Sequence, residues 1–137
     1  MPGRWLVYAD GASRGNPGPA SIGAVVYDES GQEAHTVSRR IGHGTNNEAE
    51  YKAAIAGLES ALALGGGEVE LRMDSELVIR QLQHRYKVRN ERLKPLFNRV
   101  VELRRQFDSF QMDHVPRAKN GRADELANLA LDTLEDD

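Results

Sequence analysis

The sequence predicts an α/β domain in which helices flank a five-stranded mixed sheet. Three observations lead to this fold class. The first 41 residues alternate apolar, β-branched runs with turn residues, as antiparallel strands do. Two later strand-like runs each follow a stretch with helical periodicity, which is typical of strands joined by helical crossovers. The length of 137 residues suits one domain, so residues 1–137 are predicted to form a single domain.

The first three strands are expected at residues 5–9, 22–27 and 33–41. Trp5 to Ala9 is rich in aromatic and β-branched residues, and Asp10-Gly11 is expected to end this strand because both residue types favour turns. The second and third runs flank a turn at residues 28–32 that contains Gly31. The three strands are therefore expected to pair in antiparallel order.

A long helix is predicted after Thr45, because Thr45 and Glu48 have the spacing of a capping box. The apolar residues that follow recur at steps of four, three and four, so they share one helix face: Tyr51, Ile55, Leu58 and Leu62. A run of three glycines at 65–67 is expected to end this helix.

The remaining elements alternate between strand and helix. Strands are expected at residues 69–73 and 110–115, and a basic loop at 116–122. Helices are expected around residues 77–82, about 91–107 and 123–134, the last with Leu126, Ala127, Ala130 and Leu134 facing inward.

The composition limits the chemistry of any site. The chain has no cysteine, which excludes disulfides, thiolate nucleophiles and zinc–sulfur sites, so a metal would need carboxylate or imidazole ligands. The apolar run near the N-terminus is too short for a signal peptide or a membrane span. We therefore expect a cytoplasmic monomer without a membrane partner.

Positive charge is concentrated in residues 80–105. This segment holds nine basic and two acidic residues, although the whole chain has a net charge of −3. Such asymmetry is expected where a polyanion docks beside an acidic region, but a solvated helical face explains a basic run equally well.

Four carboxylates occupy positions that suggest one site. Asp10 and Asp74 follow apolar strands, and strand ends in such sheets border the crevice where ligands bind. Glu50 and Asp124 are expected in the first turns of two helices, where an acid also stabilises the helix dipole. Carboxylates that meet repel one another unless cations neutralise them, so the four acids together predict a site for Mg²⁺, with Mn²⁺ as a substitute.

Four blocks carry a family resemblance. Residues 10–20, 45–51, 73–78 and 123–127 resemble, in this order, the signature blocks of the type 1 ribonuclease H family. The resemblance implies the ribonuclease H-like fold and a metal-dependent endonuclease that cuts the RNA strand of an RNA–DNA hybrid. It implies a two-metal-ion reaction that leaves 5′-phosphate and 3′-hydroxyl ends.

The resemblance also assigns residues. The family's catalytic and metal-binding acids correspond to Asp10, Glu50, Asp74 and Asp124, because the catalytic glutamate is the fifth residue after Thr45. Glu48 is left as the capping acid. Contacts with the hybrid are implied for a second group of residues: Gly11, Ser13, Asn16, Thr45, Asn46 and Asn47.

The sequence departs from the family pattern in three places. Residues 115–123 lack the usual loop histidine, so Arg117 or Lys119 takes its place, and Arg117 is the catalytic candidate. His114 is expected in the preceding strand. The segment between Arg80 and Phe107 is too short for the basic handle of the best-known bacterial members, and its bases, with Tyr86 and Lys87, are expected to substitute in part.

Glu76 stands where glutamine is common in the family, and it either repels a phosphate or lies in a helix's first turn without effect. The main alternative function is a non-catalytic hybrid-binding module of the same fold. A nuclease of this fold acting on another nucleic acid is a further alternative.

Overall fold

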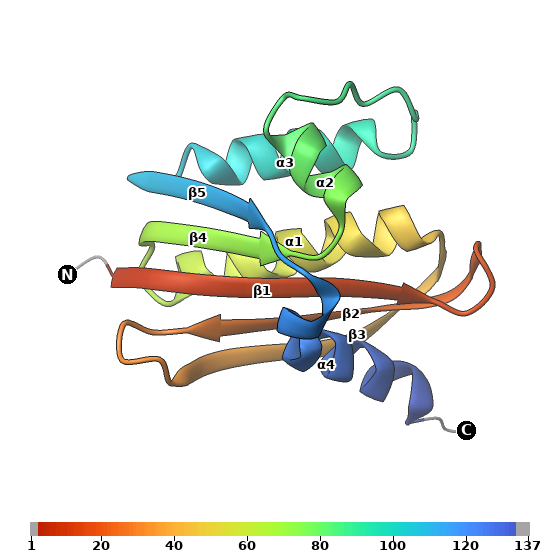
Figure 1. The fold of residues 1–137 in the computed structure, drawn as a ribbon, viewed down its shortest axis with the longest axis horizontal. Coiled ribbons are helices and arrows are strands. Elements are labelled where there is room, and N and C mark those ends of the chain that lie inside the picture. Colours follow the sequence, from red (N-terminus) through yellow and green to blue (C-terminus); the bar gives the residue numbers. More distant parts are fainter. Residues whose placement is uncertain (1–2, 134–137) are drawn as a thin grey trace.

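A five-stranded sheet forms the centre of the computed structural model, which describes residues 3–133 (Figure 1). The strands are arranged in the order β3-β2-β1-β4-β5. Their bounds are β1 Gly3–Ser13, β2 Gly18–Tyr27, β3 Glu33–Gly44, β4 Gly67–Met73 and β5 Ser109–His114. β1, β2 and β3 pair antiparallel, whereas β4 pairs parallel with β1 and β5 parallel with β4. The predicted mixed sheet is confirmed.

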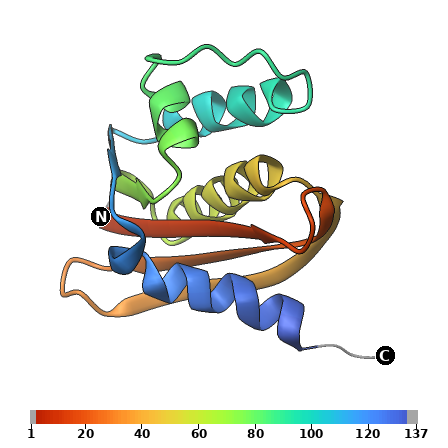
Figure 2. The same ribbon diagram turned by 45° about the vertical axis from the view of Figure 1, so that its right-hand side comes forward.

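The helices lie on both faces of this sheet (Figure 2). α1 (Asn46–Ala63) packs on one face, and α2 (Glu76–Leu82) and α3 (Lys94–Arg104) lie beyond it on the same side. α4 (Gly121–Asp132) covers β1, β2 and β3 on the opposite face, after the short 3-10 helix η1 (Arg117–Lys119). The start of α1 and the start of α4 therefore approach the central strand from opposite sides.

The main hydrophobic core lies between the sheet and α1, and it continues to α2 and α3. Val7 and Ala9 of β1 point into it, and Tyr51 and Leu58 of α1 close over them, all without solvent exposure. Because side chains alternate along a strand, the residues between them, Tyr8 and Asp10, face the α4 side. The pleat of β1 thus directs Asp10 away from this core.

Both ends of α1 follow from local sequence. Thr45 accepts a hydrogen bond from the Glu48 amide at 3.1 Å, and the Glu48 carboxylate accepts one from the Thr45 amide at 2.9 Å, which confirms the capping box. The helix ends at Ala63, and Gly65 and Gly66 follow with φ of 135° and 65°. Only glycine adopts such angles readily, so the chain can reverse there and enter β4.

Several predicted boundaries are wrong. β1 does not end at Asp10, because residues 11–13 continue the antiparallel pairing with β2 as far as Ser13. β3 likewise extends to Gly44, α3 is shorter than predicted, and α4 begins at Gly121. The predicted inward position of Leu134 lies outside the described residues. No helix within residues 3–133 combines the length and the apolar character needed to cross a bilayer.

Candidate active site

Asp10 lies inside β1, opposite Gly23 of β2. The pairing of β1 with β4 ends at Tyr8 and Arg72, so Asp10 lies just beyond the end of β4 while β2 still supports its backbone. Its side chain is only 7% exposed. A rigid central strand therefore holds a carboxyl group that is almost removed from water.

Glu50 reaches Asp10 from α1, and Gly11 makes this possible. A Cβ atom on Gly11 would lie 2.3 Å from the carbonyl carbon of Ala49 and 2.4 Å from the Glu50 amide nitrogen, so only glycine permits this approach of helix to strand. The Gly11 amide donates to Glu50 Oε1 at 2.6 Å. Glu50 is the fifth residue of α1, just past the first turn in which the sequence predicts it, whereas Glu48 occupies the first turn.

Asp124 approaches from the other face through a second glycine. A Cβ atom on Gly23 would lie 2.2 Å from the Ala123 carbonyl oxygen and 2.4 Å from the Ala127 amide nitrogen. Because Gly23 pairs with Asp10, the closest approach of α4 to the sheet occurs beside that acid. Asp124 lies in the first turn of α4, as predicted, within hydrogen-bonding reach of Asp10.

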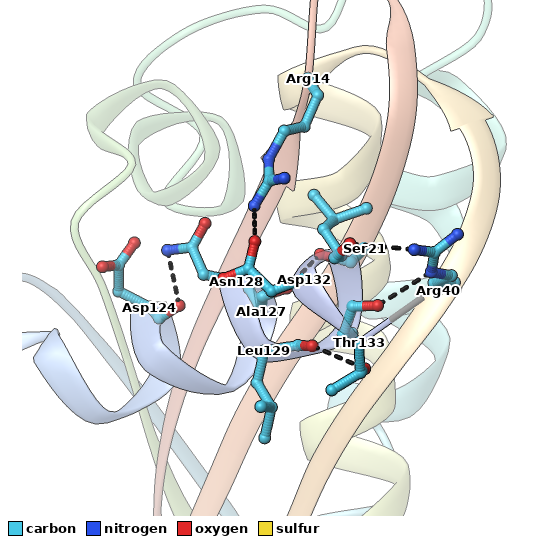
Figure 3. Close-up of polar contacts among 11 residues, drawn as sticks. Arg14, Ser21, Arg40, Asp124, Ala127, Asn128, Leu129, Asp132 and Thr133 are labelled. Atoms are coloured by element: carbon cyan, nitrogen blue, oxygen red, sulfur yellow. Dashed lines mark hydrogen bonds and ion pairs between the residues drawn. The ribbon is translucent and has the colours of Figure 1, made fainter. Parts of the chain in front are cut away.

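Polar side chains of the strands fix the remainder of α4 (Figure 3). The Ser21 hydroxyl donates to the Ala127 carbonyl at 2.5 Å, and Arg40 donates to the carbonyl oxygens of Ala130 and Leu131, both at 2.9 Å. Arg14 forms an ion pair with Asp132. These contacts fasten the later turns of α4 to the sheet.

Three of the four predicted acids form a compact cluster. Carboxylate oxygens of Asp10, Glu50 and Asp74 all lie within 4.8 Å of one another, with Asp74 directly after β4. Asp124 is outside this trio but beside Asp10. The structure therefore brings all four acids to one place, although their catalytic roles remain a prediction.

Burial and mutual repulsion change the acidity of the cluster. Burial, followed by the charge of Glu50, raises the pKa of Asp10 to about 10. Burial also raises the pKa of Glu50 to about 7, and hydrogen bonds from Asp10 and Gly11 limit this rise. The two carboxyls titrate as a pair, and both pKa values are raised, so the cluster retains a proton more readily than isolated acids do.

The donor set fits a divalent cation. Several carboxylate oxygens converge where their charges repel, with Asp10 buried and Glu50 and Asp74 half-buried, and a cation that prefers hard oxygen ligands removes that repulsion. Asp10, Glu50 and Asp74 could ligate it, and Asp124 lies near enough to contribute. Metal binding would release the proton that the cluster retains, because only an ionised carboxylate is a good ligand.

The residues predicted to contact the hybrid gather around the start of α1. Asn16 Oδ1 accepts from the Asn46 amide at 3.0 Å and joins the β1–β2 loop to the helix. Asn16, Asn46 and Asn47 are exposed, whereas Thr45 is the partly buried cap. Gly11 and Ser13, the other two predicted contact residues, already have partners within the protein. The Gly11 amide donates to Glu50, and the Ser13 hydroxyl donates to the Gly44 carbonyl at 2.8 Å.

In the loop before α4, the two residues that could take the role of the loop histidine have different surroundings. Arg117 and Lys119 are both exposed on η1. Lys119 lines a groove of about 770 Å³ together with Tyr8 and Tyr27, and none of the four acids lines this groove. His114 lies in β5, as predicted, and is its last residue.

The basic segment between α2 and α3 extends toward the predicted hybrid contacts. Lys87 and Tyr86 line a second hollow of about 410 Å³, and Tyr86 is 46% exposed. Arg92 is close enough to Glu48 for its charge to help lower the pKa of that capping acid, after the hydrogen bond from Thr45. Four exposed bases of this stretch form no ion pair within residues 3–133: Arg85, Lys87, Arg89 and Arg92.

Glu76 lies in the first turn of α2, exposed and 3.7 Å from Arg80. Arg80 partly balances the charge of Glu76, which favours a harmless position in the first helical turn over repulsion of a phosphate.

Sequence reasoning missed two residues of the site, Gly23 and the buried Asn120. The position of Asn120, four residues before Asp124, could have indicated its role, but the composition of this loop predicts only that it is basic.

Comparisons with known proteins agree with this geometry. Residues 8–130 match the protein family described as "Reverse transcriptase-like". Ribonuclease HI of Halobacterium salinarum is 48% identical over 130 residues, which cover 95% of this chain and 65% of that protein. The chain therefore spans just under two thirds of the length of this relative.

Solved structures show the same fold. RNase H1 of the same archaeon superposes with a TM-score of 0.94 at 47% identity and covers 96% of this chain and 100% of that one. LC11-RNase H1, solved in complex with an RNA/DNA hybrid, gives a TM-score of 0.89 at 46% identity and covers 93% of this chain and 96% of that one. The predicted fold is confirmed.

Proposed function

The chain belongs to the type 1 ribonuclease H family, and we propose that it is a metal-dependent endonuclease that hydrolyses the RNA strand of RNA–DNA hybrids. The observation that carries this proposal is the convergence of four carboxylates, from β1, α1, α4 and the residue after β4, at one partly buried place. Clustered carboxylates destabilise a protein that binds no cation, whereas a Mg²⁺ site is built from such oxygen ligands.

The acids have different tasks in this proposal. Asp10 is held by the central strand, Asp74 directly follows β4, and Glu50 is oriented by the Gly11 amide. Asp124 completes the ligand set from α4. Two bound Mg²⁺ ions, with Mn²⁺ as a substitute, would activate water and stabilise the leaving oxygen, giving 5′-phosphate and 3′-hydroxyl ends.

The hybrid is proposed to lie across the start of α1 and the basic segment. Asn16 and Asn46 are linked and exposed beside the acids, where they could bind the ribose 2′-hydroxyl groups that distinguish RNA from DNA. Thr45 and the amides at the start of α1 suit a phosphate of the DNA strand. Arg92 lies near the capping Glu48 of α1 and belongs to the same basic segment as Tyr86 and Lys87, which suits a duplex that contacts both.

Arg117 is proposed to replace the loop histidine. Its guanidinium stays protonated at every relevant pH, so its contribution is charge and hydrogen bonding to a phosphate and not proton transfer. The position of Lys119 on the groove with Tyr8 favours Arg117. Arg117→Ala should therefore reduce turnover by about tenfold or more without shifting the pH profile, and unchanged turnover would remove Arg117 from the mechanism.

The test is cleavage of one end-labelled RNA strand, presented alone, paired with RNA and paired with DNA, each with Mg²⁺, Mn²⁺ or chelator. We expect cutting of the hybrid alone and only with metal. A 5′-phosphate-dependent exonuclease and a poly(A) polymerase identify the two kinds of product end. Asp10→Asn serves as the inactive control.

The same assay tests the alternative of a non-catalytic module. That alternative predicts that the hybrid is bound but remains uncut with either metal, while single-stranded RNA is not bound. Cutting of paired RNA as well as the hybrid would instead support a nuclease with a wider substrate range.

A further inference from the structure

Asn120 is a buried polar residue between the acids and the start of α4. It is 1% exposed and occupies the N-cap position of α4, yet its side chain makes no capping hydrogen bond. Instead its Nδ2 atom donates to Asp74 Oδ1 at 2.7 Å and to the Ala9 carbonyl at 3.0 Å. An N-cap asparagine ordinarily bonds the amides of its own helix, so this side chain serves another purpose.

The orientation of this amide is determined by its two partners. A carboxylate and a carbonyl oxygen can only accept, so the group between them must donate twice. The NH₂ group of asparagine has two hydrogens and meets this requirement, whereas the reversed amide would bring three oxygens together. The bond also occupies Oδ1 of Asp74, and Oδ2 has no hydrogen-bond partner within residues 3–133.

Asn120 connects three of the segments that carry the acids. Its side chain bonds the residue before Asp10 and the carboxylate of Asp74. Its carbonyl accepts from the Asp124 amide at 3.1 Å, and its own amide donates to the Arg117 carbonyl at 3.0 Å. One residue thus sets the spacing between β1, the end of β4 and α4.

The unpaired atom of the same side chain indicates that this arrangement is not explained by packing. Asn120 Oδ1 is buried without a hydrogen-bond partner among the described residues. A buried oxygen without a partner destabilises the fold, and a small apolar residue would avoid this. The two donated bonds are therefore the feature that distinguishes asparagine from such a residue.

We propose that Asn120 is a positioning residue, whose side-chain amide holds the Asp74 carboxylate in the orientation that binds the metal and couples it to Asp124 through α4. It is neither a metal ligand nor a catalytic group in this proposal. The inference deepens the proposed function, since it concerns the same metal site, but its principal readout does not need cleavage.

The experiment measures binding of Mn²⁺ alone to the full chain without hybrid, by electron paramagnetic resonance, in the wild type and in Asn120→Ala. Partners of metal ligands typically contribute about 10- to 100-fold to metal affinity, so we expect a loss of at least tenfold. Asn120→Ser keeps a hydroxyl that can donate one of the two bonds, and it should lose less. It also replaces the alanine variant if that protein does not fold.

Ser21→Ala is the matched control. It removes another buried donor that ties α4 to the sheet, but one that does not touch Asp74. Melting in EDTA measures the structural effect of each variant. If Asn120 only stabilised the fold, both variants would melt earlier, and both would bind Mn²⁺ as the wild type does; this result would overturn the proposal.

Cleavage assays separate this proposal from the proposed function. In an active enzyme, Asn120→Ala should lower kcat at least tenfold at limiting Mg²⁺, with partial recovery at high Mg²⁺ and with KM for the hybrid changed by less than about threefold. A rise in KM with unchanged kcat would contradict a role in metal positioning. If the wild type cuts no hybrid but Asn120→Ala still loses Mn²⁺ affinity, the proposed function fails and the positioning role stands.

Discussion

Replacing Asp10 with Asn should stabilise the metal-free protein while it abolishes cleavage. Asp10 is almost fully buried and lies within 4.8 Å of two other carboxylates. Asn has nearly the same shape, cannot ionise and removes a ligand. The variant therefore distinguishes the effect of Asp10 on stability from its effect on metal binding and cleavage.

The magnitude follows from two independent estimates. Two unit charges 4.8 Å apart repel by about 3.5 kcal/mol at an effective dielectric constant of about 20. If Asp10 instead keeps its proton at pH 8, protonating a group with an ordinary pKa of 3.8 costs up to about 6 kcal/mol, at 1.36 kcal/mol per pH unit. Relaxation lowers both values, so we expect a gain of about 2 kcal/mol or more in the free energy of unfolding.

The pH dependence has a definite sign. The pKa of Asp10 is raised to about 10 on folding, so between 3.8 and that value the folded state binds more protons than the unfolded state. The stability of the metal-free wild type must then fall as the pH rises through this window. Glu50 adds the same trend between 4.5 and about 7. Asp10→Asn should show a shallower decline, and its advantage should be smallest near pH 4.

The assay is urea unfolding in EDTA at pH 5 and pH 8, repeated with Mg²⁺. The exposed Asp108, which lies near Gly67 at the opposite end of β4, supplies the control Asp108→Asn. Mg²⁺ should stabilise the wild type and the control but have little effect on Asp10→Asn. A gain below about 0.5 kcal/mol at pH 8, or an equal gain in the control, would refute the argument that the buried acids repel.

Three further predictions concern the rest of the site. Glu50→Gln should reduce cleavage at least a hundredfold at unchanged fold, whereas Glu48→Gln keeps an oxygen that accepts from the Thr45 amide and should retain nearly full cleavage; the reverse order would mean that the wrong glutamate is assigned. Gly23→Ala should lower stability by about 1 to 3 kcal/mol and reduce kcat, because its Cβ meets the α4 backbone, whereas Gly121→Ala, whose Cβ meets nothing within 4 Å, should do neither. Lys87→Ala should weaken hybrid binding and lower the slope of log affinity against log salt by about one, with unchanged kcat; an unchanged slope would exclude a phosphate contact.

The sequence predicts the fold well because its signals are local. Alternating apolar runs, the capping box at Thr45 and Glu48 and the glycines after Ala63 each specify a strand, a helix start or a helix end without distant contacts. Boundaries that depend on pairing are predicted less well. Residues after Asp10 have the composition of a turn, yet β2 provides a ladder that extends β1 to Ser13.

The acids of the site could be named from the sequence, but the way they are brought together could not. Gly11 and Gly23 have ordinary turn or strand contexts in the sequence. Their importance arises from two helices that touch the same segment of sheet from opposite faces. Asn120 was missed for the same reason, because its partners Ala9 and Asp74 are distant in sequence.

These features together connect stability with metal binding. Gly11 and Gly23 allow α1 and α4 to approach so closely that their acids share one small volume with Asp10. The same approach that assembles the proposed cation site also creates repulsion in the metal-free protein, so packing around the site must hold the acids together against that repulsion. Asn120 supplies that restraint on the α4 side, because its side chain bonds the Asp74 carboxylate and its carbonyl accepts from the Asp124 amide. Variants that remove the Asn120 contacts should therefore lose metal affinity before they lose the fold, because the acids relax their mutual repulsion by moving apart.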